Sequence, residues 1–258
     1  SLITSSIMSK KLAAGSDAIL LDVKCGSGAF MKTEQDARRL AELMVKIGSA
    51  AGKETVAVIT DMDQPLGRAV GNALEVREAI QVLKNEGPDD ITELSVKLAG
   101  TMVYLGGRAS SLQEGEQKAA QALSDGSALQ KFREFVAAQG GDPDITEDPG
   151  LLPSAEISED LKAWCDGYIA GMDTMRIGLA SQHTGAGRET KDDEIDLSAG
   201  LYLHRKTGEY VRKGDVICTV YGNDVKKVGK ALEEVGNSVK IRNDKPEPQK
   251  LIKAVITV

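Results

Sequence analysis

The sequence predicts an α/β protein with a mostly parallel sheet flanked by helices, followed by a C-terminal β-rich module. Residues 18–24 are almost continuously apolar, as in a strand buried on both faces, and residues 54–60 are strongly β-prone. Segments of helical period follow, at 33–51 and 72–84. This order of strand, helix, strand and helix implies right-handed crossovers between parallel strands. After Leu152 short apolar runs alternate with turns, which indicates the β-rich module.

The helices are assigned from apolar spacing and from caps. Residues 2–14 carry an apolar stripe and end before Gly15, a suitable C-cap. Thr33 is a suitable N-cap for a helix that continues through Ala51. Three further helices are expected at 89–106, 111–125 and 127–138, before a cluster of breakers at 140–144.

The C-terminal region contains apolar runs at 167–172, 201–204 and 216–221, then a helix at 225–235 and a closing strand at 251–258. Residues 208–217 resemble the compact β-sandwich turn of the biotinyl and lipoyl carrier folds. Such carriers present a modified lysine at a hairpin tip beside Met or Asp, and the sequence has no such tip at that place. A structural module of the barrel-sandwich or hammerhead-like kind is therefore expected.

Composition excludes several classes of function. A net charge of −7 argues against a nucleic-acid groove, and 3% aromatic residues are too few for a base-stacking platform. No apolar run approaches the roughly 20 residues that a membrane span needs, and no signal peptide is recognisable. Cys25, Cys165 and Cys218 are widely spaced, as expected for reduced thiols, with Cys25 a small buried filler. These features together favour a soluble cytoplasmic protein.

Residues 61–78 connect the second strand to the next helix, the place where open α/β sheets bind ligands. A proline and a glycine bend this loop, and a bent loop can turn backbone carbonyls inward. The carbonyls of Leu66 and Ala69, with the Glu78 carboxylate, would form an all-oxygen cage for a hard monovalent or divalent cation. The alternative is a solvated turn whose acidic side chains face water.

The first helix carries a second candidate site. Ser6 and Lys10 are four residues apart, so both project from one helix face and can reach the same ligand. A hydroxyl and an ammonium at this spacing suit a planar polar ring with carbonyl oxygens. On an ordinary helix, the same two side chains would simply be solvated.

Three segments occur together in this order: Leu-Ile-Thr-Ser-Ser-Ile-Met-Ser-Lys-Lys-Leu at 2–12, Asp-Val-Lys-Cys-Gly-Ser-Gly-Ala-Phe-Met at 22–31, and Asp-Met-Asp-Gln-Pro-Leu-Gly-Arg-Ala-Val-Gly-Asn-Ala-Leu-Glu-Val at 61–76. Together they resemble the pyrimidine nucleoside phosphorylases, the class that includes thymidine phosphorylase. The resemblance implies reversible phosphorolysis of uridine, thymidine and deoxyuridine, with inorganic phosphate as co-substrate, by a homodimer that takes part in nucleoside salvage.

The resemblance also assigns roles to residues. It implies that Ser6 and Lys10 hydrogen-bond the pyrimidine and stabilise the charge that builds on it as it departs. It implies that the carbonyls of Leu66 and Ala69 and the carboxylate of Glu78 hold a potassium ion. The expected divisions are the last helix of a helical lobe at 1–15, an α/β phosphorylase core at 16–150 and a C-terminal α+β module at 151–258.

In the family a phosphate loop of the Lys-His-Ser-Thr-Gly-Gly type, a base-pairing arginine and most of the helical dimerisation lobe precede the segments seen here. The chain is therefore expected to be a C-terminal portion without detectable phosphorolysis of its own. The loop 183–188 imitates a phosphate cradle but is expected only to abut the active-site domain, and His204 to be a half-buried structural residue.

Three alternatives remain: a thymidine-specific phosphorylase, a non-catalytic module of the same fold, and a phosphoribosyltransferase of related fold. The last is disfavoured by the C-terminal module, and it would need Asp61 and Asp63 as its magnesium pair.

Overall fold

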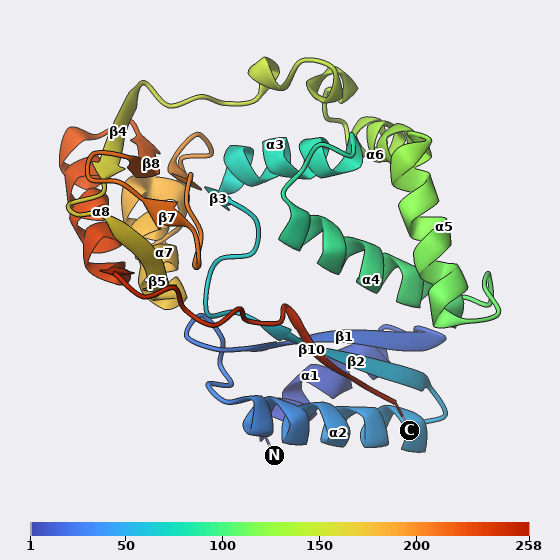
Figure 1. The fold of residues 1–258 in the computed structure, drawn as a ribbon. Helices are drawn as coiled ribbons and strands as arrows, with labels where there is room; N and C mark the ends of the chain where they lie inside the picture. Colours follow the sequence, from blue (N-terminus) through green and yellow to red (C-terminus); the bar gives the residue numbers. More distant parts are fainter. Residues whose placement is uncertain (1, 258) are drawn as a thin grey trace. The chain divides into compact units, whose positions relative to one another are not determined.

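The computed structural model describes residues 2–257, which form two compact units (Figure 1). The first unit contains residues 2–62, 93–122 and 249–257, and the second contains residues 63–92 and 123–248. These units divide the chain at other points than the predicted ranges 1–15, 16–150 and 151–258. The reason is long-range strand pairing, because the last strand returns to the first sheet and a short strand near residue 70 joins the C-terminal sheet.

The first unit is built on a three-stranded sheet in the order β1-β2-β10. Strands β1 (Ala18–Cys25) and β2 (Glu54–Asp61) are parallel, as predicted, with Ala18 opposite Glu54. Strand β10 (Ile252–Ile256) pairs antiparallel with β2. The carboxyl ends of β1 and β2 therefore meet at one edge of the sheet, at Cys25 and Asp61.

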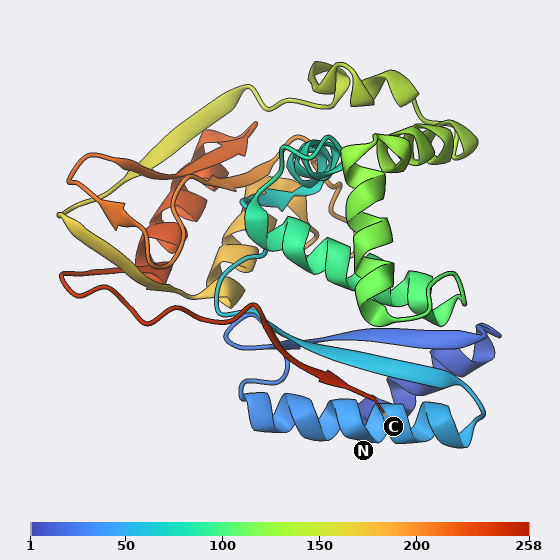
Figure 2. The same cartoon turned by 45° about the vertical axis from the view of Figure 1, so that its right-hand side comes forward.

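Helices α1 (Leu2–Ala13) and α2 (Glu34–Ala50) pack on the same face of this sheet (Figure 2). Met8 of α1 and Met44 of α2 belong to one apolar core with alternate residues of β1 and β2. Thr33 caps α2 as predicted, because its side chain accepts a hydrogen bond from the Asp36 amide at 3.1 Å. Hydrophobic burial along this face fixes how both helices lie on the sheet.

The remaining helices of the core are α3 (Asn72–Leu83), α4 (Asp89–Leu105), α5 (Leu112–Ser124) and α6 (Ser127–Ala138). The ends of these helices lie within two residues of the predicted ranges. Two short 3₁₀ turns follow, Pro143–Thr146 and Pro149–Leu151, where the breaker-rich sequence begins.

The C-terminal module of the second unit contains two antiparallel sheets. One has the order β3-β6-β8-β4 and comprises β3 (Ala69–Gly71), β6 (Gly200–Leu203), β8 (Val216–Gly222) and β4 (Ile157–Lys162). The other has the order β7-β5-β9 and comprises β7 (Tyr210–Val211), β5 (Gly167–Met172) and β9 (Val239–Arg242). Helices α7 (Thr174–Ser181) and α8 (Val225–Ser238), with the π-helical turn η3 (Gln182–Ala186), complete the module.

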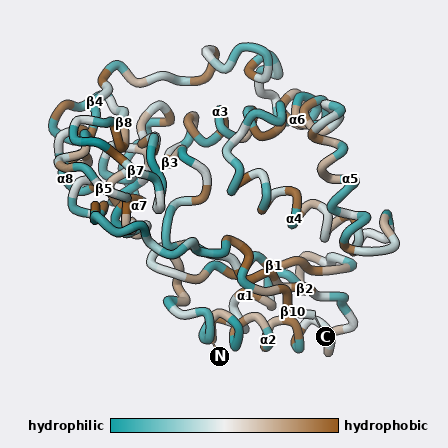
Figure 3. Tube along the Cα trace, viewed as in Figure 1, coloured by the Kyte–Doolittle hydropathy of each residue, from teal (hydrophilic) through white to brown (hydrophobic). Residues whose placement is uncertain are grey.

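One apolar core holds the C-terminal module together. Its fully buried side chains include Ile169, Ile177, Leu201 and Val235, from both sheets and both helices. The hydropathy trace shows apolar segments within both units (Figure 3). Along residues 2–257 no helix combines the length and apolar character that crossing a membrane requires.

Candidate functional site

Helix α1 presents the two residues predicted to read a base. Ser6 and Lys10 are exposed, while Thr4 and Met8 on the same helix are buried. The four-residue spacing places the hydroxyl and the ammonium on one side of the helix. Burial of the opposite side anchors the helix, so a rigid element carries both groups.

A polar cluster lies at the carboxyl ends of β1 and β2 in the same unit. The Thr60 hydroxyl donates to Asp22 Oδ1 at 2.5 Å, and Lys24 Nζ lies 2.6 Å from Asp22 Oδ2. The buried carboxylate of Asp61 pairs with Lys253 Nζ of β10 at 2.9 Å. Asp61, one of the two acids that a magnesium pair would need, therefore already has a cationic partner within the first unit.

In the second unit, Glu78 of α3 lies beneath the loop that precedes β3. Its side chain is only 3% exposed, and Oε1 accepts hydrogen bonds from the amides of Arg68 at 2.7 Å and Ala69 at 3.1 Å. Burial raises the pKa of the Glu78 carboxyl, and the two amide hydrogen bonds act in the opposite direction. The carboxylate therefore fixes the backbone at the end of this loop.

Gly67 brings the loop into contact with this carboxylate. Its φ is +67°, a left-handed conformation that side chains disfavour, and a Cβ atom there would lie 2.1 Å from Glu78 Oε2. The position needs glycine for two reasons at once, the backbone conformation and the close approach of a carboxylate oxygen.

The same loop binds an ammonium group from the C-terminal module. Lys206 is 8% exposed, and its Nζ donates to the carbonyl oxygens of Pro65 and Gly67, the latter at 2.6 Å. A third hydrogen bond, of 3.0 Å, reaches Asp90 Oδ2 at the start of α4, and this oxygen also accepts from the Gly67 amide at 3.2 Å. Burial lowers the pKa of Lys206, and the Asp90 carboxylate opposes this effect.

Comparison with known proteins supports the family resemblance along almost the whole chain. A model of the glycosyl transferase family a/b domain matches residues 2–129, and a model of the pyrimidine nucleoside phosphorylase C-terminal domain matches residues 168–242. A pyrimidine-nucleoside phosphorylase of Staphylococcus epidermidis is 51% identical over 256 residues, which cover 99% of this chain and 59% of the relative. Over almost its whole length the chain is a relative of the pyrimidine-nucleoside phosphorylases.

Other pyrimidine-nucleoside phosphorylases match this chain with similar identity and coverage. The protein of Bacillus subtilis is 48% identical over 256 residues, which cover 99% of this chain and 59% of the relative. That of Geobacillus stearothermophilus is 53% identical over 222 residues, or 86% of this chain and 51% of the relative. The chain thus spans less than two thirds of the length of these members of the family.

The resemblance to phosphorylases implies a potassium ion at the loop before β3. The loop contains ligand types that such an ion could use. It offers backbone carbonyls and a buried carboxylate, the oxygen donors that a hard cation prefers. The carbonyls of Pro65 and Gly67 point to a positive charge, and that charge is the Lys206 ammonium. The potassium ligands Leu66, Ala69 and Glu78 stay a prediction.

Two further regions that the sequence singled out form hydrogen bonds within the second unit. His183 of η3 forms a 2.6 Å hydrogen bond from Nδ1 to Glu234 of α8, and the Ala186 carbonyl of the same turn accepts from Asn72 at the start of α3. His204 is half-buried, as predicted, and its Nε2 lies 2.8 Å from the Thr219 hydroxyl.

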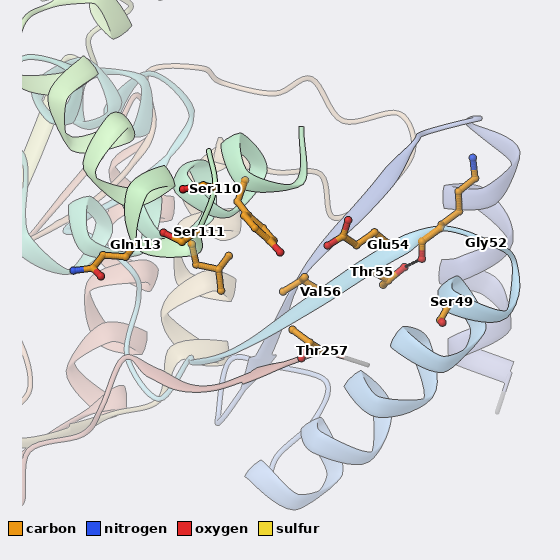
Figure 4. A pocket seen from close by; sticks show the side chains of 12 residues that line it. Ser49, Gly52, Glu54, Thr55, Val56, Ser110, Ser111, Gln113 and Thr257 are labelled. Atoms are coloured by element: carbon orange, nitrogen blue, oxygen red, sulfur yellow. Dashed lines mark hydrogen bonds between the residues drawn. The ribbon is translucent and has the colours of Figure 1, made fainter. Parts of the chain in front are cut away.

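A pocket of about 820 Å³ lies in the first unit (Figure 4). It is lined by Glu54 to Val56 at the amino end of β2, whereas the Asp22 and Thr60 cluster lies at the carboxyl end. Its other wall includes Ser110 and Ser111. The Glu114 side chain accepts a hydrogen bond from the Ser110 amide, and the Glu114 amide donates to the Ser111 hydroxyl, as in a helix cap. The Ser111 hydroxyl therefore already serves as a cap of α5 at this wall.

Sequence reasoning missed Lys206. It stands within Leu-His-Arg-Lys-Thr-Gly, which reads only as a turn after a strand, and the loop it contacts is about 140 residues earlier in the chain. No local pattern predicts such a contact. The pairing of β3 with β6, which brings the two segments together, was equally absent from the predicted elements.

Proposed function

We propose that the protein that carries this chain catalyses the reversible phosphorolysis of pyrimidine nucleosides. Uridine, thymidine or deoxyuridine and inorganic phosphate would give the free base and ribose or deoxyribose 1-phosphate. The observation that carries the proposal is about 50% identity to pyrimidine-nucleoside phosphorylases across 99% of the chain. Because the chain spans 59% of those relatives, the activity is assigned to the protein at its natural length.

The chemistry explains why a hydroxyl and an ammonium are needed on α1. A phosphate oxygen forms the new bond to C1′ of the sugar while the glycosidic C–N bond breaks, and its electron pair leaves with the base. Negative charge then grows on the base and its carbonyl oxygens. Hydrogen bonds from Ser6 and Lys10 become stronger as this charge grows, so they stabilise the transition state more than the bound substrate.

The second part of the proposal is a potassium ion held by the carbonyls of Leu66 and Ala69 and by Glu78. The ion would supply a fixed positive charge that stiffens the loop near the phosphate. The buried Glu78 carboxylate supports this part. A homodimeric assembly and a cytoplasmic location complete the proposal.

The decisive experiment compares Lys10→Ala with Lys11→Ala in the protein at its natural length. Lys11 is also exposed and lies on another face of α1, so it controls for loss of a surface charge. We expect Lys10→Ala to lower kcat/KM for uridine by about 100-fold or more, the usual effect of removing a donor to developing charge, and Lys11→Ala to lower it less than threefold. Equal effects of the two substitutions would refute the assignment of Lys10.

The same assay decides between broad and narrow specificity. Comparable kcat/KM for uridine and thymidine supports a pyrimidine-nucleoside phosphorylase, whereas activity with thymidine alone supports a thymidine-specific enzyme. If neither nucleoside reacts while uracil still binds in a calorimetric titration, the protein is a non-catalytic module of the same fold.

A further inference from the structure

Residues 64–69, which precede and begin β3, are called the candidate cation loop. The C-terminal module contacts this loop through one turn. This turn, residues 204–209 between β6 and β7, is called the β6–β7 turn. Its Thr207 amide donates to Gln64 Oε1 at 3.1 Å, at the beginning of the loop. At the end of the loop, Arg68 donates to the His204 carbonyl at 2.8 Å and to Glu209 at 3.1 Å. The loop is therefore tied to the turn at both ends.

Lys206 contacts the loop between these two sets of hydrogen bonds. Its three N–H donors match three acceptors: two loop carbonyls and one oxygen of Asp90. A buried ammonium is stable only when such partners replace its water, and here they do. Hydrogen bonds to a charged group are stronger than neutral ones, so this contact holds the loop more firmly than neutral partners would.

The surroundings of the ammonium are those of a small monovalent cation. Backbone carbonyls and a carboxylate are also the ligands expected for a potassium ion in this loop. We propose that the Lys206 ammonium acts as a built-in monovalent cation, a positioning residue through which the C-terminal module orders residues 64–69. The order of the loop follows from contacts within the second unit, while its benefit to phosphorolysis rests on the proposed function.

The proposal is tested by local hydrogen exchange. The amides of Gly67, Arg68 and Ala69 donate to Asp90 and Glu78, so peptides that cover them report on loop order. Lys206→Met should raise their exchange rates about tenfold or more, the effect of losing one charged hydrogen bond. Peptides from α8 should exchange as in the parent protein, which shows that the module still folds.

Rescue by free cations separates a positioning role from a merely packed side chain. Ammonium or potassium chloride should restore protection in Lys206→Met, and choline chloride at the same ionic strength should not, because choline is too large for the vacated position. Lys230→Met, at an exposed position on α8, is the matched control and should leave the loop unchanged in every salt.

A second variant keeps the lysine and removes its carboxylate partner. Asp90→Asn should also accelerate exchange at Gly67, even if Lys206→Met does not fold. Unchanged exchange in both variants, or equal restoration by choline, would overturn the proposal. All measurements use the protein at its natural length and need no substrate, so loss of the proposed phosphorylase activity alone would leave this result standing.

Discussion

Gly67 offers the sharpest test of how the candidate cation loop is built. Its Cα lies against Glu78 Oε2 so closely that an alanine Cβ would stand 2.1 Å from that oxygen. The Gly67→Ala substitution therefore forces Glu78 to move, in addition to placing a side chain at a φ of +67°. Both consequences can be expressed as a cost in the free energy of unfolding.

The left-handed conformation costs a side chain about 1–2 kcal/mol. Displacing the buried carboxylate breaks at least one of its hydrogen bonds to the Arg68 and Ala69 amides, and a hydrogen bond to a charged group contributes about 1.5–3 kcal/mol. The free energy of unfolding of the second unit should fall by the sum, about 2.5–5 kcal/mol.

Urea denaturation followed by tryptophan fluorescence measures this change, because Trp164, the one tryptophan of this chain, lies in the second unit. Gly126→Ala is the matched control. Gly126 lies in the same unit with a φ of +77°, and no atom approaches its added Cβ within 4 Å. It should therefore show the conformational cost alone, about 1–2 kcal/mol.

A double-mutant cycle isolates the contact between the two residues. In a Glu78→Ala background the displaced carboxylate is gone, so Gly67→Ala should cost no more than Gly126→Ala. If Gly67→Ala costs the same with and without the Glu78 carboxylate, the loop does not depend on this contact and the reasoning fails.

Two predictions concern titratable groups. Burial raises the pKa of the Cys218 thiol to about 12, and Cys25 is also buried. Of the three cysteines of this chain, only the half-buried Cys165 should therefore react rapidly with a thiol reagent at pH 8. The Cys165→Ser substitution should remove this rapid phase of the reaction. Burial lowers the pKa of His204 below its ordinary 6.5, so the unfolded state binds more protons and the free energy of unfolding should fall as the pH drops through about 6.5. His204→Gln should reduce this slope in urea titrations at pH 5.5 and 8, and an unchanged slope would assign it to other groups.

Local sequence was sufficient for the elements whose partners lie nearby in the chain. The apolar runs of β1 and β2 predicted a parallel pair, and Thr33 predicted the beginning of α2, because burial and capping depend on residues a few positions apart. The buried position of Cys25 followed from the same reasoning.

Elements that exist only through distant partners could not be predicted in this way. Strand β3 has three residues, too few for a recognisable alternation, and it forms because Ala69 pairs with Tyr202. Helix α7 was also missed, since its eight residues contain glycine and lie among short strands. The sequence predicted that the loop turns carbonyls inward, but not that Lys206 binds those of Pro65 and Gly67.

The contact with Lys206 also explains how two carboxylates can remain so near each other. Burial raises the pKa of Glu78, and repulsion from the nearby Asp90 carboxylate adds to this effect. Two carbonyl oxygens turned to the same side add further negative potential. Such an arrangement is unstable unless positive charge lies within it, and Lys206 is attracted to both carboxylates. A loop that concentrates oxygen atoms for a mobile cation would tend to open whenever that cation leaves, whereas a covalently attached ammonium stays. The C-terminal module therefore contributes a charge that keeps the loop in place, and it cannot be treated as a passive appendage to the α/β core.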